Sequence, residues 1–183
     1  MIAETLSLAG EKLTLRPFTL EDAPRVQELV SNWNVASMVA RIPHPYPDGA
    51  AEDWISGHNE RRTAADHWPF AVETKKAGLV GTIGLGKTES GSMEIGYWVG
   101  EPYWGKGIAS EAVRVLVEFG FDILGLDRLV SGHFKDNPAS GRILTKTGFR
   151  ETGEEKRFCL ARGEELDCIT LELTAPEHEK ARR

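Results

Sequence analysis

A glycine-bearing stretch in the middle of the chain has the residue types of an anion-binding loop. Residues 100–107 follow a short alternating run and lead into a segment that we expect to begin a helix at about Ile108. Unpaired backbone N–H groups at a helix N-terminus, with the helix dipole behind them, attract a phosphate. Gly105 and Gly107 lack the Cβ atoms that would keep a phosphate from the backbone, and Ala109 keeps the next turn small. The loop alone therefore predicts either a phosphate site or a helix start with two turn glycines and no ligand.

Two common nucleotide-binding motifs match this loop only in part. Residues 100–106 have the Walker spacing, but Gly107 stands where that motif requires the Ser or Thr that binds magnesium. The dinucleotide fingerprint also fails, because Ser110 occupies the position of its third Gly or Ala. A phosphate-loop nucleotide hydrolase is therefore the weaker alternative, and magnesium-dependent ATP hydrolysis would support it.

A third motif fits better. Residues 104–109 (Trp-Gly-Lys-Gly-Ile-Ala) resemble the coenzyme A pyrophosphate loop of the GNAT acetyltransferase superfamily, whose pattern is Gln/Arg-x-x-Gly-x-Gly/Ala. Tryptophan in the first slot is the form seen in the branch resembling the ribosomal-protein (alanine/serine) N-terminal acetyltransferases. Residues 94–99, 136–140 and 146–149 also look like motifs of that branch, in the expected order. The resemblance covers roughly residues 12–173.

The resemblance implies an acetyl-CoA-dependent N-acetyltransferase that needs no metal. A primary amine, either a protein N-terminus or a small-molecule amine, would attack the thioester directly. Backbone groups at the end of the fourth strand would pair with the pantetheine arm, and N–H groups of the loop would hold the pyrophosphate. The implied cofactor contacts are Trp98, Val99, Trp104, Gly105, Lys106, Gly107, Ile108, Ala109, Ser110, Asn137 and Ser140. Asn137 also fits a plain helix N-cap, which is compatible with ligand contact.

Two residues are candidates for the chemistry. By resemblance Ser140 would lie near the thioester sulfur and protonate the leaving thiolate. Glu94 is the candidate base, acting through water, and its alternative is an exposed carboxylate on an alternating strand. An α-amino group has a pKa of about 7.7–8.0, so an N-terminal acceptor needs less help than a lysine, whose pKa is about 10.4. Cys159 falls where relatives that acetylate ribosomal proteins carry a glutamate, and we expect it to be a small strand hydrophobe.

Acceptor choice is expected to depend on a variable front segment that comprises Trp33, Asn34, Met38, residues 43–47 and Trp54. The five histidines show no metal-binding spacing and are expected on the surface or in loops. A different functional class is a non-catalytic sensor that binds acyl-CoA but has lost turnover. Release of free thiol with any amine would distinguish the enzyme from the sensor.

The composition is that of one globular domain. The chain has 183 residues, with 22 Lys and Arg against 28 Asp and Glu, which gives a net charge of −6. This charge disfavours direct nucleic-acid binding but permits a local basic pocket. No run approaches the ~18 apolar residues of a membrane span, the start lacks a signal-peptide pattern, and two cysteines are too few for a disulfide scaffold. We therefore expect a cytoplasmic monomer or homodimer.

The periodicity of the chain predicts the elements that position these residues. Strands are expected at 12–16, 68–74, 79–85, 93–99, 128–133, 156–160 and 168–173, and helices at 20–30, at 48–62 and after residues 107 and 137. The helix that links the strands at 93–99 and 128–133 requires that pair to be parallel. We expect an α/β fold in one domain, residues 1–183, with a frayed tail at 175–183. The mixed sheet should have about seven strands flanked by about four helices, and the resemblance implies a splay between strands 4 and 5.

Overall fold

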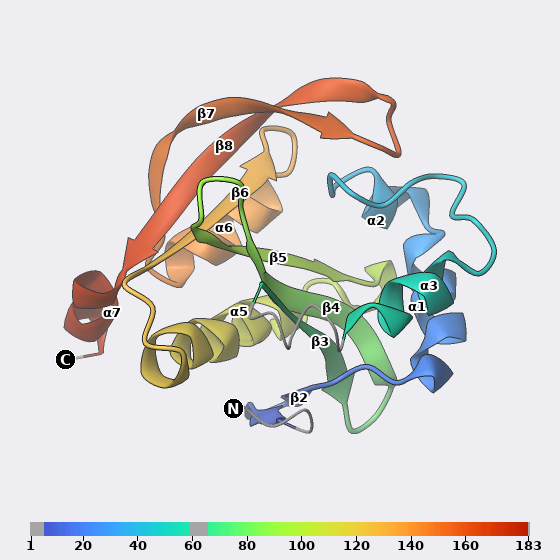
Figure 1. Cartoon of the computed structure of the whole chain (residues 1–183), viewed down its shortest axis with the longest axis horizontal. Coiled ribbons are helices and arrows are strands. Elements are labelled where there is room, and N and C mark those ends of the chain that lie inside the picture. The colour runs from blue at the N-terminus through green and yellow to red at the C-terminus, as the bar shows by residue number, and fades with distance from the viewer. Residues whose placement is uncertain (1–5, 59–65, 183) are drawn as a thin grey trace.

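The computed structural model describes residues 6–58 and 66–182, which form an eight-stranded mixed sheet with helices on both faces (Figure 1). The strand order is β1-β2-β3-β4-β5-β6-β8-β7. The strands are β1 (Leu8–Ala9), β2 (Leu13–Arg16), β3 (His67–Thr74), β4 (Gly78–Lys87), β5 (Met93–Val99), β6 (Arg128–Phe134), β7 (Arg150–Cys159) and β8 (Glu164–Thr174). The helices are α1 (Ala23–Val30), α2 (Trp33–Ala36), α3 (Ala50–Ser56), α5 (Ile108–Glu118), α6 (Pro138–Lys146) and α7 (Ala175–Ala181).

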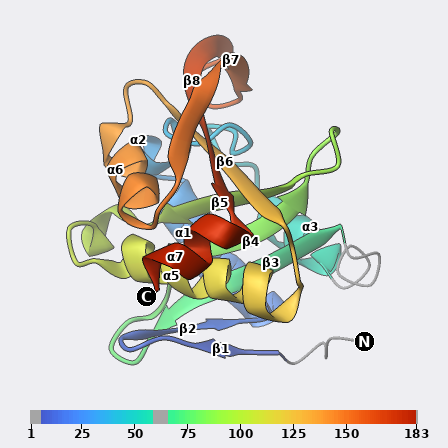
Figure 2. The same cartoon turned by 90° about the vertical axis from the view of Figure 1, so that its left-hand side faces the viewer.

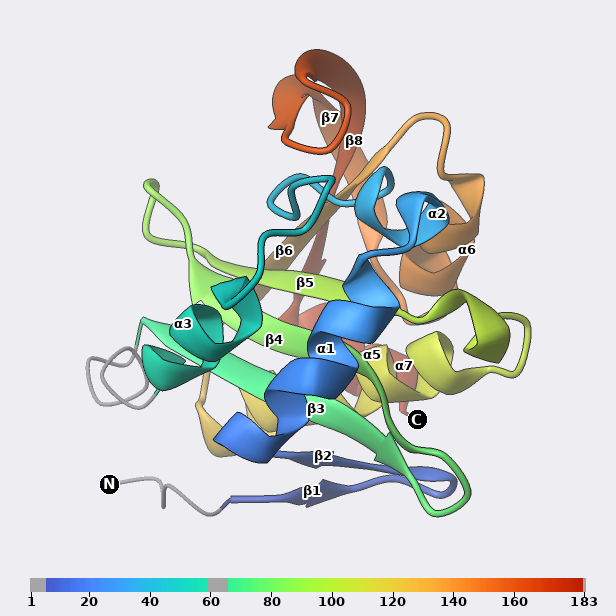
Figure 3. The same cartoon turned by 90° about the vertical axis from the view of Figure 1, so that its right-hand side faces the viewer.

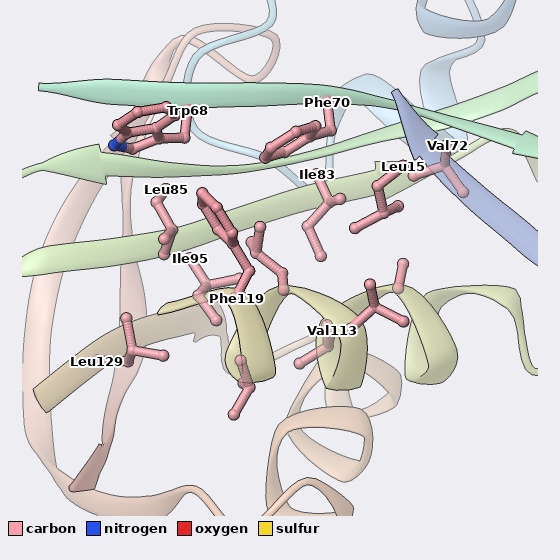
Figure 4. Packing of buried hydrophobic residues seen from close by; sticks show 14 of the residues in the cluster. Leu15, Trp68, Phe70, Val72, Ile83, Leu85, Ile95, Val113, Phe119 and Leu129 are labelled. Carbon is pink, nitrogen blue, oxygen red and sulfur yellow. The ribbon is translucent and has the colours of Figure 1, made fainter. Parts of the chain in front are cut away.

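Helix α5 packs its apolar side against one face of the sheet, as the spacing of its residues predicts. Val113, Leu116 and Val117 are fully buried there, at the three- and four-residue intervals of one helix face. Figure 4 shows Val113 and Phe119 pointing toward side chains from β2, β3, β4 and β5. Helices α1 and α3 cover the opposite face of the sheet (Figure 3). The domain thus has one apolar core on each side of the sheet.

Strands β5 and β6 run in parallel for only a short distance and then separate. Their pairing extends from Met93–Leu129 to Ile95–Ser131, where the Ser131 hydroxyl donates a hydrogen bond of 2.9 Å to the Ile95 carbonyl. Beyond Ile95, β5 continues beside β4 whereas β6 continues beside β8. The parallel pairing is confirmed, and the expected splay lies between β5 and β6. From Gly96 onward, β5 therefore has an edge that β6 does not cover.

Local sequence signals explain how the helices next to the splay begin and end. Gly107, the N-cap of α5, has a φ of 79°, which favours glycine over other residues. The side chain of Asn137 accepts a hydrogen bond from the Ser140 N–H at 3.3 Å, with Pro138 at the first helical position of α6. Gly148, with a φ of 100°, follows the last turn of α6. These three predictions are confirmed.

The structure differs from the expected elements in two places near the N-terminal half. Strand β1 and the short helix α2 were not expected, because both are too short to show a period. The helix expected from residue 48 begins at Ala50, and residues 59–62 of its expected span lie outside the described residues.

The expectation of a frayed tail is wrong, because residues 175–181 form helix α7. Thr174 caps this helix: its hydroxyl and its N–H both donate to the Glu177 carboxylate, at 2.8 and 3.1 Å. His178 stacks on Phe121 with ring centroids 4.9 Å apart, which places α7 beside the end of α5 (Figure 2). Within the described residues, no helix combines the length and the apolar character needed to cross a membrane.

Candidate functional site

A cleft of about 950 Å³ opens where β5 and β6 separate. It is lined by the uncovered part of β5, the loop before α5, the start of α6 and residues from the α1–α3 side. Most of the residues singled out from the sequence meet there: Glu94, Trp98, Val99, Trp104, Gly105, Gly107, Ile108, Ala109, Ser110, Asn137 and Ser140. Predicted residues from three segments of the chain, 94–99, 104–110 and 137–140, therefore share one concave site.

The loop before α5 has the geometry of an anion cradle. Gly105 and Gly107 have φ values of 71° and 79°, and a Cβ added to either would meet no atom within 4 Å. No side chain caps the start of α5, so side chains leave its first N–H groups available. An anion can therefore approach the backbone at this helix N-terminus, where the dipole favours negative charge.

Two side chains of this loop have roles that the sequence did not predict. Lys106 does not line the cleft: its Nζ donates to the Pro102 carbonyl at 2.8 Å and lies 5.4 Å from the centre of the Tyr103 ring. Trp104 donates from its indole Nε1 to the Val99 carbonyl at 2.6 Å, which ties the loop to the end of β5. Any contact of Lys106 with a ligand anion would thus come from its backbone N–H. The Val99 carbonyl already accepts a hydrogen bond from Trp104.

The cleft is basic although the whole chain is acidic. Among the described residues that line it, four side chains are cationic and one is a carboxylate, namely Arg41, Arg142, Lys146 and Arg157 against Glu94. The chain as a whole carries a net charge of −6. A cavity lined mainly by one sign of charge raises the local concentration of oppositely charged ligands. The cleft is therefore suited to a polyanion.

Tyr97 and Ser140 form a hydrogen-bonded pair inside the cleft. Their hydroxyl oxygens lie 2.7 Å apart, and the Tyr97 hydroxyl also donates to the Ser140 carbonyl at 3.3 Å. Burial raises the pKa of Tyr97 to about 12, against the effect of its hydrogen bond to Ser140. Tyr97 is therefore a protonated donor throughout the neutral pH range. Tyr97 is not predicted as a site residue from the sequence, because its alternation with Ile95 and Val99 is also what a core residue shows.

Glu94 is held by an ion pair on the other face of β5. Its carboxylate lies 2.5 Å from the Arg157 guanidinium, which also pairs with Glu155. Burial acts to lower the pKa of Arg157, but the two carboxylates outweigh it and raise that pKa above its ordinary value. Along β5, Glu94 alternates with Tyr97, so the carboxylate and the Tyr97–Ser140 pair approach the strand from opposite faces. The two candidate catalytic groups, Glu94 and Ser140, therefore lie on opposite faces of β5.

The expected acceptor front is only partly correct. Met38, Pro43 and Trp54 line the cleft, whereas Trp33 and Asn34 do not. Trp33 is 47% exposed, and its ring lies 5.2 Å from that of His44. Asn34 donates from its side chain to Glu101 at 2.8 Å. Trp33, at the start of the short helix α2, thus lies on the surface, whereas Trp54, inside α3, borders the cleft.

The remaining expectations concern cysteine and histidine. Cys159 is fully buried, its Sγ lies 3.4 Å from the Val39 carbonyl, and it packs with Phe134 and Cys168. This placement matches the expected small strand hydrophobe. The expectation that the histidines lie on the surface or in loops is wrong for two of them, His58 and His178, which are buried. In residues 6–58 and 66–182, no group of three or more His, Cys, Asp or Glu side chains could hold a metal ion.

Comparisons with known proteins agree with this geometry. Residues 12–150 match the family model of the acetyltransferase (GNAT) domain. The uncharacterised N-acetyltransferase YoaA of Bacillus subtilis is 35% identical over 174 residues, which cover 92% of this chain and 97% of that protein. The ribosomal protein uS5-alanine N-acetyltransferase of Escherichia coli is 25% identical over 139 residues, or 73% of this chain and 71% of that protein. The structure of Mycobacterium smegmatis RimJ in complex with CoA-disulfide has a TM-score of 0.81 and 25% identity, and the match covers 94% of this chain and 89% of that one.

Proposed function

The chain belongs to the GNAT family of acetyltransferases and is an acetyl-CoA-dependent acyltransferase, and from this premise we propose that the cleft acetylates a primary amine. The observation that carries the proposal is the meeting of the glycine cradle, the uncovered edge of β5 and the Tyr97–Ser140 pair in one cleft. A polyphosphate group, an extended arm and a thioester sulfur each have a matching partner there. The same cleft leaves its α1–α3 side open for the amine.

The residues present fit acetyl-CoA as the acyl donor. The N–H groups from Gly105 to Ser110 would hold the pyrophosphate, because positive φ values and open space leave the backbone accessible. Arg142 and Lys146, which line the cleft from α6, would add charge for the phosphates. The uncovered edge of β5 around Trp98 would pair with the pantetheine arm, as an added strand pairs with a sheet edge.

The mechanism we propose is direct attack of the amine on the thioester carbonyl. Glu94 accepts a proton from the substrate ammonium through water, since only the free amine can attack. The new N–C bond forms as the C–S bond breaks, and the nitrogen gives up its second proton to water. Ser140 donates its proton to the leaving sulfur and takes a proton from the Tyr97 hydroxyl, 2.7 Å away, and water returns a proton to Tyr97. Because a free thiol has a pKa of about 8.5, the departing thiolate needs only a weak proton donor.

Two measurements test the proposed function in turn. Acetyl-CoA should raise the melting temperature without added metal, whereas ATP with magnesium should not. A ligand that binds only the folded state stabilises it by about 2.7 kcal/mol at a hundredfold excess over its dissociation constant. Release of free thiol on adding amines then tests turnover. Stabilisation without thiol release from any amine would favour the acyl-CoA sensor, and no stabilisation at millimolar acetyl-CoA would refute the proposed cofactor.

A further inference from the structure

The cleft continues on the α1–α3 face of β5 as a chamber with apolar walls. Figure 3 shows the elements around it, with α1 and α3 in front of β4 and β5. The walls come from α1, from the segment between α2 and α3, from α3 itself and from β3. The apolar residues that line them are Val26, Val30, Ile42, Pro43, Tyr46, Ala50, Trp54 and Pro69. This chamber lies across β5 from the Tyr97–Ser140 pair.

The floor of the chamber is almost free of side chains. Gly84 of β4 and Gly96 of β5 are directly paired across the two strands, and both line the cleft. Gly86 is the next residue of β4 on the same face, opposite Glu94. A Cβ added to Gly96 would meet no atom within 4 Å, so the space above it is open. A Cβ added to Gly84 would instead lie 2.9 Å from the Trp68 carbonyl oxygen of β3. A flat or extended apolar group can therefore lie directly on the backbone at Gly96, on the side of the floor away from β3.

The charge around the chamber is unfavourable for a substrate with several positive charges. Glu94 is the one carboxylate among the described residues that line the cleft, and Arg157 already pairs with it. Arg41, from the segment between α2 and α3, adds a second cation to the lining. A polyamine carries two or more ammonium groups, and those beyond the first would face apolar walls or Arg41. Burying such charges without a partner is costly.

We infer that the acceptor is a small monoamine with an apolar body, alkyl or aromatic, and this inference rests on the proposed acetyltransferase function. The amine lies at the Glu94 end of the floor, next to Gly96, where β5 leaves β6. The apolar body extends from the open space above Gly96 toward Trp54 and Tyr46. Removing its surface from water supplies the affinity, and Glu94, although it is paired with Arg157, is the carboxylate of the described lining that can face the ammonium.

The first test compares acceptors at one pH by the rate of thiol release at saturating acetyl-CoA. Phenethylamine and hexylamine represent the inferred class, spermidine represents polyamines, and a short peptide with an N-terminal alanine represents protein acceptors. We expect kcat/KM for the two monoamines to exceed that for the other two by about tenfold or more, as the burial of several methylene groups predicts. Preference for spermidine or for the peptide would overturn the inference. If none of these amines caused thiol release in a protein that acetyl-CoA still stabilises, the proposed function would be refuted as well.

Two variants test the chamber itself. Gly96→Val places a side chain in the open space above the floor, so kcat/KM for phenethylamine should fall about tenfold or more while acetyl-CoA still raises the melting temperature. Ala50→Glu adds a carboxylate to the wall at the start of α3, where acidic residues are tolerated. It should raise the ratio of spermidine to phenethylamine turnover.

The matched control for Ala50→Glu is Ser56→Glu, an exposed position on the same helix that does not line the cleft. It adds the same charge and should leave the ratio of the two amines unchanged. An equal change of that ratio in both variants would show a long-range charge effect and overturn the placement of the acceptor. An unchanged kcat/KM for phenethylamine in Gly96→Val would also overturn the placement of the acceptor, because the floor would then not contact the substrate.

Discussion

Replacing Ser140 by alanine should slow turnover and leave the affinity for acetyl-CoA almost unchanged. The hydroxyl matters most as negative charge grows on the leaving sulfur, and this charge is absent when acetyl-CoA merely binds. The backbone contacts that would hold the cofactor are not altered, because Ser140 keeps its N–H bond to the Asn137 side chain. The variant therefore separates a role in the chemical step from a role in binding.

The size of the effect follows from the hydrogen bonds of the pair. A single donor to a developing charge is worth about 1–3 kcal/mol, or roughly ten- to a hundredfold in kcat. Tyr97→Phe keeps the serine hydroxyl but removes its partner at 2.7 Å. Loss of one neutral hydrogen bond costs about 0.5–1.5 kcal/mol, so kcat should fall by about two- to tenfold. We therefore expect kcat to fall further in Ser140→Ala than in Tyr97→Phe.

The assay is thiol release at saturating acetyl-CoA, with calorimetry of acetyl-CoA binding for each variant. If Tyr97 acts through Ser140, the double variant should be no slower than Ser140→Ala alone, because the relay is already broken. Multiplied losses in the double variant would mean that the two residues act separately. A wild-type kcat in Ser140→Ala would refute the reasoning altogether, and catalysis would then rest on alignment of the two reactants.

Three further predictions address the cradle, the base and the buried tyrosine. Gly107→Val should reduce the acetyl-CoA thermal shift more than Lys106→Ala does, because a branched Cβ blocks the backbone while the Lys106 amine points away from the cleft; the reverse order in calorimetry would contradict this. Glu94→Gln should lose most activity at low pH and recover as rising pH deprotonates the amine, and a wild-type pH–rate profile would assign Glu94 a structural role. Burial raises the pKa of Tyr97 from 10.0 to about 12, so its contribution to stability is complete below pH 10 and is lost as the pH rises toward 12, by roughly 3 kcal/mol. Denaturant unfolding of Tyr97→Phe should therefore show a smaller loss of stability above pH 10 than the wild type does.

The sequence predicted the elements whose signals are local. The apolar runs of β3 and β4, the strand β5 and the caps at Asn137 and Gly148 all lie where residue type and spacing placed them. The parallel pairing of β5 and β6 also followed, because a helix between adjacent strands leaves few topologies. Helix α2 and strand β1 were not predicted, because their four and two residues are too few to show a hydrophobic period.

The side-chain pairs of the site could not be predicted in the same way. Glu94 meets Arg157, and Tyr97 meets Ser140, only after the sheet has brought distant segments together. Each of these residues, taken alone, also fits an ordinary strand or helix position. A single sequence contains no signal for such a pair, because the partner is chosen by register and not by spacing along the chain.

Lys106 shows why composition and motif can assign charge to the wrong place. A lysine between two glycines suggests a phosphate clamp, but its amine is bound to the Pro102 carbonyl and lies over the Tyr103 ring. In the proposed function the loop would therefore hold the pyrophosphate by its N–H groups, which carry only partial charge. The full positive charges that face the cofactor side of the cleft come from Arg142 and Lys146, two residues of α6 that belong to no glycine motif. A chain with a net charge of −6 can thus offer a polyanion a favourable site, because four cations and a single carboxylate, Glu94, line the cleft among the described residues.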